Sequence, residues 1–263
     1  MRNRIVMLLL AASLAGCGLL PEQIDETRGW SAQKLYAAAM DSMNDKDYTQ
    51  AIKYLEKLES RYPYGVYAQQ AQMEIAYAYY KDNEPASSLA AADRFIKLHP
   101  DNPHVDYVYY LKGLVNFNDN SGFFASISDQ DMSERDPKAA RESFDAFKTL
   151  VDRFPSSKYR EDAIARMNYL VNSLADHEVS VARYYYNRGA YLAAANRAQD
   201  AIKDYPGTPA RERALALMMY SYQKLGLTDL KNDAERVLKL NFPKSVYLNS
   251  DNFEAKRAWW QFF

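Results

Sequence analysis

The tripeptide Arg61-Tyr62-Pro63 closes an apolar run that begins near Tyr48 and has the spacing of a helix. A ring residue followed by proline closes four later runs in the same way: Leu98-His99-Pro100, Arg153-Phe154-Pro155, Asp204-Tyr205-Pro206 and Asn241-Phe242-Pro243. Proline cannot continue a helix, and it moves the residue before it out of the α region. These five repeat prolines therefore predict five helix ends at one place in a repeated unit, at intervals of 37, 55, 51 and 37 residues.

The interval of 37 residues, twice lengthened by insertion, is close to the roughly 34 residues of the tetratricopeptide (TPR) repeat, a pair of antiparallel helices. The first unit resembles the TPR pattern at Asp47-Tyr48, Ala51, Leu55 and Pro63, although the Trp and the Leu-Gly of the first TPR helix are absent. We therefore predict an all-α protein, a right-handed superhelical TPR solenoid of about five repeats and about ten helices.

The predicted organisation follows the prolines and the composition. A signal peptide (1–16) and a lipidated flexible tether (17–30) precede five repeats (31–65, 66–103, 104–157, 158–207, 208–243), the third of which carries an inserted loop (118–136), and an aromatic tail (244–263) ends the chain. Scarce glycine, nine residues in all, suits a helical chain. The uninterrupted run from Tyr159 to about Asn187 predicts one long helix, or two with a bend near Asp176-His177.

The amino terminus has the pattern of a secretory signal. Two arginines precede about ten apolar residues, a run too short to span a membrane. The stretch Leu14-Ala15-Gly16-Cys17 resembles the bacterial lipobox, which implies cleavage before Cys17 and lipidation of it; the alternative is an ordinary signal with an incidental cysteine. The residue after the cysteine is Gly18 and not Asp, and by the same resemblance this implies export to the outer membrane.

Charge and cysteine content exclude several function classes. Residues 1–16 hold two arginines and no acid, so the mature chain carries 31 basic and 34 acidic side chains, a net charge of −3. This balance does not favour nucleic acid as a partner. Lipidation would use the only cysteine, Cys17, which leaves none for a disulfide, a zinc site or a thiol nucleophile.

No catalytic or cofactor-binding constellation is found in the sequence. The three histidines are scattered, and His99 occupies the ring position before a repeat proline, where packing explains it. Asp129 and Asp131 superficially resemble a calcium loop, but Glu134 replaces the required glycine and Ala140 stands at the bidentate position, so a solvated acidic loop is the preferred interpretation. We expect no cofactor, no metal and no enzyme activity.

Arg197 is the position that departs from the repeat pattern. Four of the five residues that lie nine positions before a repeat proline are apolar or aromatic, and the fifth is Arg197, on a helix rich in alanine. An unpaired buried charge is unfavourable. Arg197 must therefore extend to solvent, pair internally or face a partner. For the tail (244–263), with its Trp and Phe residues, a cap over the last repeat is preferred over a partner-binding peptide.

Beyond the TPR spacing, the mature chain resembles the BamD (ComL/YfiO) family, TPR lipoproteins of the outer-membrane β-barrel assembly (BAM) complex. The resemblance rests on these stretches: Arg61-Tyr62-Pro63, Gln72 to Lys81, Asp93-Arg94-Phe95-Ile96, Asp106-Tyr107-Val108, Phe123-Phe124, Arg135-Asp136-Pro137, Tyr184-Tyr185, Arg188-Gly189-Ala190, Asn196-Arg197 and Asp204-Tyr205-Pro206. It weakens in the last repeat and the tail.

The resemblance implies a lipid-anchored protein on the periplasmic side of the outer membrane. Its C-terminal repeats would bind a periplasmic domain of a BamA-like barrel subunit, with Arg197 in that contact, and other BAM lipoproteins (BamC, BamE) would be further partners. Its N-terminal repeats would form a groove for the terminal signals of unfolded outer-membrane proteins. Tyr62, Tyr79 and Arg94 match candidate groove positions, although Tyr79 could be core, and Phe123 and Phe124 mark a candidate interaction loop.

The function expected is that of a non-enzymatic scaffold that assists the folding and insertion of β-barrel proteins. One alternative is another periplasmic TPR lipoprotein role, as a secretin pilotin or a peptidoglycan-associated factor. A second alternative is a cell-wall hydrolase. Copurifying proteins would separate the first alternative from the scaffold, and a peptidoglycan-release assay would test the second.

Overall fold

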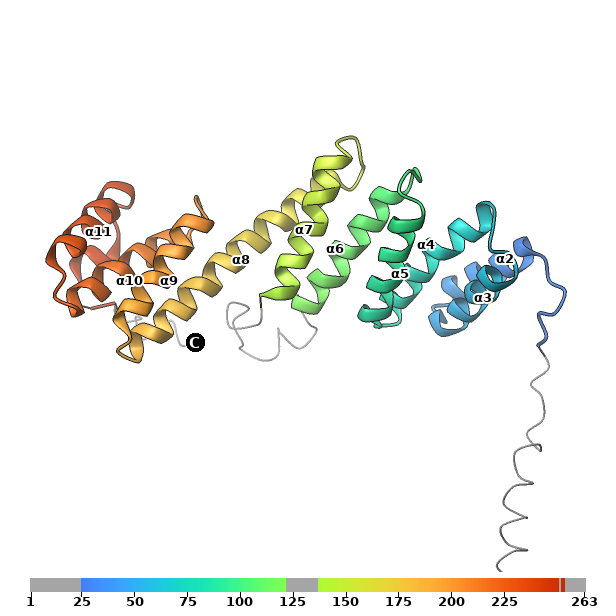
Figure 1. The fold of residues 1–263 in the computed structure, drawn as a ribbon, viewed down its shortest axis with the longest axis horizontal. Coiled ribbons are helices and arrows are strands. Elements are labelled where there is room, and N and C mark those ends of the chain that lie inside the picture. Colours follow the sequence, from blue (N-terminus) through green and yellow to red (C-terminus); the bar gives the residue numbers. More distant parts are fainter. Residues whose placement is uncertain (1–24, 122–136, 251, 254–263) are drawn as a thin grey trace, which may run out of the picture.

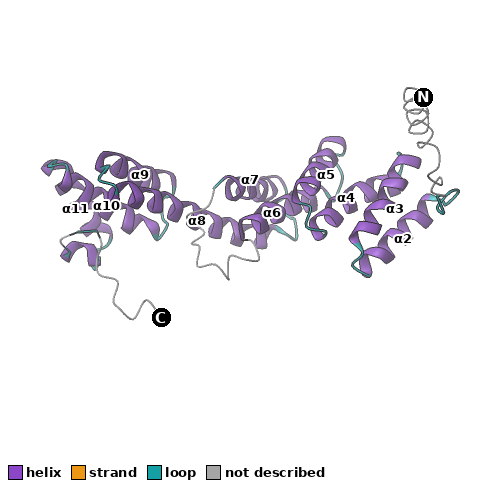
Figure 2. Ribbon diagram, turned by 90° about the horizontal axis from the view of Figure 1, so that it is seen from below, coloured by secondary structure: helices purple, strands orange, loops and turns teal. Residues whose placement is uncertain are grey.

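The computed structural model describes residues 25–121, 137–250 and 252–253, and within them the chain forms ten α-helices and no strand (Figure 1). Figure 2 shows the same all-helical arrangement from below. The helices are α2 (Ala32–Asn44), α3 (Tyr48–Arg61), α4 (Val66–Lys81), α5 (Pro85–Leu98), α6 (Val105–Ser121), α7 (Lys138–Arg153), α8 (Arg160–Asn187), α9 (Tyr191–Asp204), α10 (Ala210–Lys224) and α11 (Thr228–Asn241).

The helices form an elongated array, because each one packs mainly against its neighbours in the chain. Helix α2 lies at one end of the array and α11 at the other (Figure 1). The pairs α2/α3, α4/α5, α6/α7, α8/α9 and α10/α11 fall one to each predicted repeat. The all-α solenoid class expected from the sequence is confirmed.

The predicted helix ends at the repeat prolines are confirmed. Helices α3, α5, α7, α9 and α11 each end two residues before a repeat proline, so that the ring residue becomes the C-cap. The five C-caps share one backbone conformation, with φ between −133° and −125° and ψ between 56° and 68°. The proline that follows disfavours the α region for these residues, which is why all five helices end alike.

The turns inside four of the helix pairs also share one conformation. Lys46, Asn83, Gly189 and Gly226 each lie 17 residues before a repeat proline, and each has φ between 61° and 78°. A left-handed residue there reverses the chain between the two helices of a pair. Glycine adopts it without strain in the last two repeats, asparagine tolerates it in the second, and Lys46 adopts it at a cost of about 1 kcal/mol.

Three apolar clusters follow one another along the array in place of one round core. The first joins α2 to α6 around Leu55 and Phe95, and the second joins α6, α7 and α8 around Phe147 and Leu170. The third joins α8 to α11 around Tyr220. Helix α8, a single helix of 28 residues, packs its first half into the second cluster and its second half into the third. The alternative of two helices with a bend near Asp176-His177 was wrong.

One boundary differs from the sequence prediction, and the next one agrees with it. Helix α6 was expected to end near Asn116, with the loop beginning at Asn118, but α6 continues to Ser121. The reason is local, because the first glycine or proline after Gly113 is Gly122. Helix α7 begins after Pro137, where the sequence predicted that the helix would resume.

The segment after α11 packs back onto the last repeats as far as residue 253. The hydroxyl of Tyr220 lies 2.7 and 2.8 Å from the carbonyl oxygens of Tyr247 and Ser250. The rings of Tyr247 and Phe253 stack with centroids 5.4 Å apart, and Phe253 packs edge-on against Tyr186. This segment covers the end of the third cluster, as the capping interpretation expects. The aromatic residues Trp259, Trp260, Phe262 and Phe263 lie outside the described residues.

Candidate functional site

Arg197 takes part in an ion-pair cluster that joins three helices. Its Nη1 atom donates to Oε2 of Glu178 at 2.9 Å, so Arg197 of α9 is tied to α8. The Nη2 atom of Arg141, on α7, lies 3.5 Å from the other oxygen of the same carboxylate. The Glu178 side chain is 8% exposed, whereas that of Arg197 is 45% exposed. The internal pair that sequence reasoning left open is therefore present, and half of the Arg197 side chain still faces solvent.

The cluster, here called the Arg197 site, carries an excess of positive charge. Two guanidinium groups share the single buried carboxylate of Glu178. Helix α9 packs through Ala194, Ala195, Ala198 and Ala201, and Arg197 of the same helix pairs with Glu178 of the neighbouring α8. The carboxylate orients Arg197 without neutralising both arginines. Such a surface suits an acidic group on a partner.

Tyr79 and Arg94 line one cavity of about 620 Å³ between α3, α4 and α5, here called the first cavity. The Tyr79 hydroxyl donates to Oε1 of Glu56 at 3.0 Å. Arg94 Nη2 donates to Oε2 of Glu59 at 2.8 Å. Burial, and then the hydrogen bond to Glu56, raise the pKa of Tyr79, so it remains a neutral donor at physiological pH. Tyr79 also packs against the first apolar cluster, so the core and groove interpretations both describe it.

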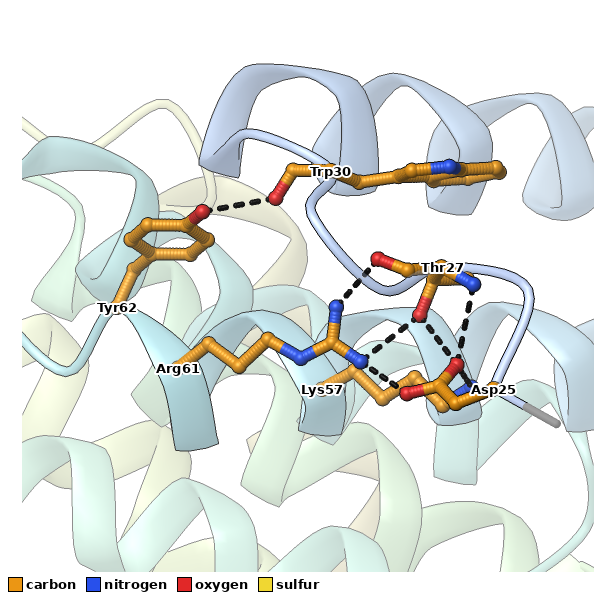
Figure 3. Close-up of polar contacts among 6 residues, drawn as sticks. All are labelled: Asp25, Thr27, Trp30, Lys57, Arg61 and Tyr62. Carbon is orange, nitrogen blue, oxygen red and sulfur yellow. Dashed lines mark hydrogen bonds and ion pairs between the residues drawn. The ribbon is translucent and has the colours of Figure 1, made fainter. Parts of the chain in front are cut away.

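Tyr62 does not line the first cavity, so the three candidate groove residues do not form one site. Its hydroxyl donates to the carbonyl oxygen of Trp30 at 2.8 Å (Figure 3). The position of Tyr62 in the chain explains why it lies apart from the first cavity. Tyr62 is the C-cap of α3, beyond the last helical residue, and its side chain reaches back towards residues 25–30. It is 37% exposed and remains accessible at that end of the array.

Residues 25–30 are held on α3 by a polar cluster that sequence reasoning missed. Lys57 Nζ donates to Asp25 Oδ1 at 2.7 Å, and Arg61 pairs with the other oxygen of that carboxylate. Arg61 Nη1 also donates to the carbonyl oxygen of Thr27 at 2.6 Å (Figure 3). We call Asp25, Thr27, Lys57 and Arg61 the N-terminal clamp. The prediction of a flexible tether as far as residue 30 was wrong for residues 25–30.

The clamp could have been anticipated only in part. Lys57 and Arg61 stand four residues apart on α3, so their side chains lie on the same side of the helix. Nothing in the sequence says which carboxylate, among 34 acidic residues, they would meet. Thr27, which is 4% exposed, donates its hydroxyl to Asp25 at 2.7 Å and completes the arrangement.

The N-terminal clamp is expected to weaken progressively as pH falls below about 4. Its hydrogen bond with Lys57, then that with Thr27, hold the pKa of Asp25 well below the ordinary value of about 4. A folded-state pKa below the unfolded one stabilises the docked segment above the unfolded pKa, and this stabilisation is lost as pH falls below it. Trp30 fluorescence reports docking once Trp259→Phe and Trp260→Phe leave it as the only tryptophan.

A substitution gives the matched control for this titration. Asp25→Asn is expected to show at pH 7 the Trp30 emission that the unsubstituted chain shows only well below about pH 4. Asp41→Asn, which removes an exposed carboxylate on α2, is expected to change neither. A docked spectrum for Asp25→Asn at pH 7 would show that the carboxylate does not hold the segment.

Three of the residues singled out from the sequence, Cys17, Phe123 and Phe124, lie outside the described residues. His99 packs against Phe95 with ring centroids 5.2 Å apart, as expected for a residue explained by packing. Within the described part of the chain, no group of three or more His, Cys, Asp or Glu side chains is placed to hold a metal ion. Nor do the helices described there include one long and apolar enough to span a bilayer.

Comparisons with families, curated proteins and solved structures each found similar proteins. A profile of the YfiO family, described as "Outer membrane lipoprotein", matches residues 29–238. The outer membrane protein assembly factor BamD of Neisseria meningitidis serogroup A is 47% identical over 266 residues, covering 100% of both chains. BamD of Vibrio cholerae is 37% identical, covering 89% of this chain and 96% of its own. Among solved structures, the P58(IPK) TPR domain covers 82% of this chain and 53% of its own, with 16% identity and a TM-score of 0.40.

Proposed function

This chain belongs to the YfiO (BamD) family of outer membrane lipoproteins, and on that premise we propose that it is a non-enzymatic scaffold of β-barrel protein assembly. It binds the barrel subunit of the assembly complex and receives segments of unfolded outer-membrane proteins. The family membership carries the proposal, and the elongated helical array suits it. Such an array offers several binding surfaces in one chain and requires no covalent chemistry.

The contact with a BamA-like barrel subunit is assigned to the Arg197 site. Support comes from the orientation of Arg197 before any partner binds, because the buried Glu178 carboxylate already fixes its guanidinium. A preoriented charge loses less conformational entropy on binding than a free side chain does. Arg141 keeps Glu178 paired if a partner carboxylate draws Arg197 away. The acidic group on the partner would be a carboxylate that meets Arg197 with charge-assisted hydrogen bonds.

Arg197→Glu is expected to reduce recovery of the barrel subunit about tenfold or more when the tagged, lipidated protein is isolated from detergent-solubilised outer membrane. The substitution places a second carboxylate beside Glu178 and reverses the charge presented to the partner. Arg236→Glu, at an exposed arginine of α11, is the control and should leave recovery unchanged. Quantitative mass spectrometry of the copurified proteins gives the measurement.

The possible outcomes separate the proposals. Equal recovery of the barrel subunit with Arg197→Glu and wild type would support a role in the assembly complex but would show that Arg197 is not part of the contact. Recovery of a secretin or of peptidoglycan-bound proteins, in place of a large barrel protein, would support the alternative TPR lipoprotein roles and contradict the scaffold. Release of peptidoglycan fragments by the purified protein would contradict the absence of enzyme activity.

The first cavity is proposed to receive the ends of unfolded barrel proteins. Tyr79 offers a ring and a neutral hydroxyl, and Arg94 offers donors for a carboxylate or carbonyl group. Arg94 donates to Glu59, so an incoming anionic group has to displace the Glu59 carboxylate. Tyr62 would contribute at a separate place, next to the N-terminal clamp. BamC- and BamE-like lipoproteins are further proposed partners, and Phe123 and Phe124 remain a candidate interaction loop.

A lipid on Cys17 is proposed to hold the protein on the periplasmic face of the outer membrane. Seven residues separate Cys17 from Asp25, the first residue of the N-terminal clamp. Fully extended, this connection spans at most about 28 Å. A lipid on Cys17 would therefore hold the α2–α3 end of the array close to the membrane surface, and the α11 end would extend away from it.

A further inference from the structure

A second cavity, of about 390 Å³, opens between α5, α6 and α7. Acidic side chains from two helices line it, Asp93 from α5 and Glu142 and Asp145 from α7. Lys112 and Asn116 of α6 lie between them.

The two cavities lie at equivalent positions in two successive repeats. Counted forward from the preceding repeat proline, or back from the following one, their linings use matching positions. The matching pairs are Tyr79 and Asn116, Ile75 and Lys112, Glu56 and Asp93, Arg94 and Thr149, Ser87 and Glu142, and Ala90 and Asp145. In a regular array, equivalent positions face the same way, so both cavities open on one face with α5 between them.

The charged residues that line the two cavities differ. The arginine of the first cavity is a threonine in the second, and a serine and an alanine are replaced by Glu142 and Asp145. Lys112 pairs with Asp93 and balances it. Glu142 has only a loose pair at 3.7 Å with Lys138, and Asp145 forms no ion pair with any described residue. The second cavity therefore holds uncompensated negative charge.

Asn116 is a further indication, besides the uncompensated charge, that the second cavity binds a ligand. It is 6% exposed and lines the second cavity. Its side-chain amide makes no hydrogen bond to the residues that the structure describes. Buried amides are almost always hydrogen-bonded in native proteins. The amide oxygen of Asn116 lines a cavity that also holds two uncompensated carboxylates, so it can accept a hydrogen bond from a cationic donor.

We propose that the second cavity receives a lysine or arginine side chain from an extended polypeptide. Glu142 and Asp145 would pair with the cation, and the amide oxygen of Asn116 would accept one of its hydrogen bonds. The occupant is a segment of unfolded polypeptide, because the equivalent first cavity opens across α5 and one extended chain can place side chains in both. This inference rests on the proposed function of the first cavity and adds a charge requirement to its substrate.

The test compares matched, blocked, dye-labelled octapeptides that contain one tyrosine and one arginine, with citrulline replacing arginine in the partner peptide. Citrulline keeps the shape and removes the charge. The arginine stands two, four or six residues from the tyrosine, so that the series covers the separation of the cavities. Fluorescence anisotropy is expected to show about fivefold tighter binding of at least one arginine peptide, with the preference weakening as salt rises.

Substitutions locate the preference in the second cavity. The double variant Glu142→Gln, Asp145→Asn is expected to bind both peptides equally, at the affinity wild type shows for the citrulline peptide. Asn116→Leu, of similar size, is expected to reduce the preference without abolishing it. The control Asp152→Asn, Glu161→Gln removes two exposed carboxylates outside the cavity and should keep the full preference. Retained citrulline binding confirms that each variant is folded.

The inference is overturned if wild type binds both members of each peptide pair equally, or binds neither, or if the double variant keeps the preference. None of these results would touch the barrel-subunit contact, which copurification with Arg197→Glu tests separately. Loss of the barrel subunit from wild type, with the arginine preference intact, would reject the scaffold and keep the cation site.

Discussion

Replacing Gly113 by valine is expected to destabilise the α6–α7 pair by about 2–3 kcal/mol. Gly113 lies inside α6, and a Cβ atom there would come within 2.6 Å of Cζ of Phe147 on α7. Phe147 is fully buried in the second apolar cluster, so its ring cannot move aside. The helices are also joined at this point, because Ser143 Oγ donates to the Gly113 carbonyl oxygen at 2.8 Å.

Thermal unfolding and hydrogen exchange measure this effect. Ala37→Val, at an exposed position of α2, adds the same β-branched side chain to a helix and should cost only about 0.5 kcal/mol. Faster exchange of α6 and α7 amides in Gly113→Val, with a midpoint lowered by roughly 4–10 °C, is the expected result. Equal midpoints for the two variants would contradict the close approach of α6 to Phe147.

Cys17→Ser is expected to move the protein almost completely from the membrane fraction to the soluble periplasmic fraction. The lipobox resemblance implies a diacylglyceryl group and a fatty acyl group on that residue, and hence three chains. Each buried CH₂ contributes about 0.8 kcal/mol, so one chain binds only weakly and reversibly, whereas several chains anchor firmly. Removing the sulfur removes all of them, because the serine cannot accept the diacylglyceryl group.

Fractionation of osmotically shocked cells followed by immunoblotting measures the redistribution. Gly18→Asp is the informative companion, since the same resemblance predicts that it stays membrane-bound but moves to the inner membrane. Cys17→Ser protein that still sediments with the outer membrane in high salt would show that another element anchors the chain. Such a result would leave the TPR array and the Arg197 site untouched.

The parts of the fold that the sequence predicts depend on local sterics. A proline constrains the residue before it wherever the chain goes, which is why all five C-caps agree with the prediction. The spacing of Ala51, Ile52, Leu55 and Leu58 marks the buried face of α3 for a similarly local reason, because residues three and four apart share a helix face. Arg197 stood out by charge alone, and its internal partner was one of the alternatives.

The parts that the sequence could not predict depend on contacts between distant residues. Asp25 meets α3 across more than 30 residues, and no local pattern specifies that pairing. Tyr62 lies apart from Tyr79 because its side chain, at the C-cap of α3, points towards Trp30. Gly113 meets Phe147 of the next helix, and no local pattern predicts that contact. The matching of the two cavities depends on the packing of α5, which lines both of them.

Helix α8 has a mechanical consequence for the whole array. Its 28 residues span about 42 Å without a break. A partner that tilts the C-terminal repeats by about 10° around the far end of this lever would swing the other end by about 7 Å, a displacement that follows from its length. Short helices joined by turns would absorb such a tilt by changes in the turns, whereas a single continuous helix transmits it. A tilt of the last repeats is therefore carried along α8 to the α6–α7 pair, against which its first half packs.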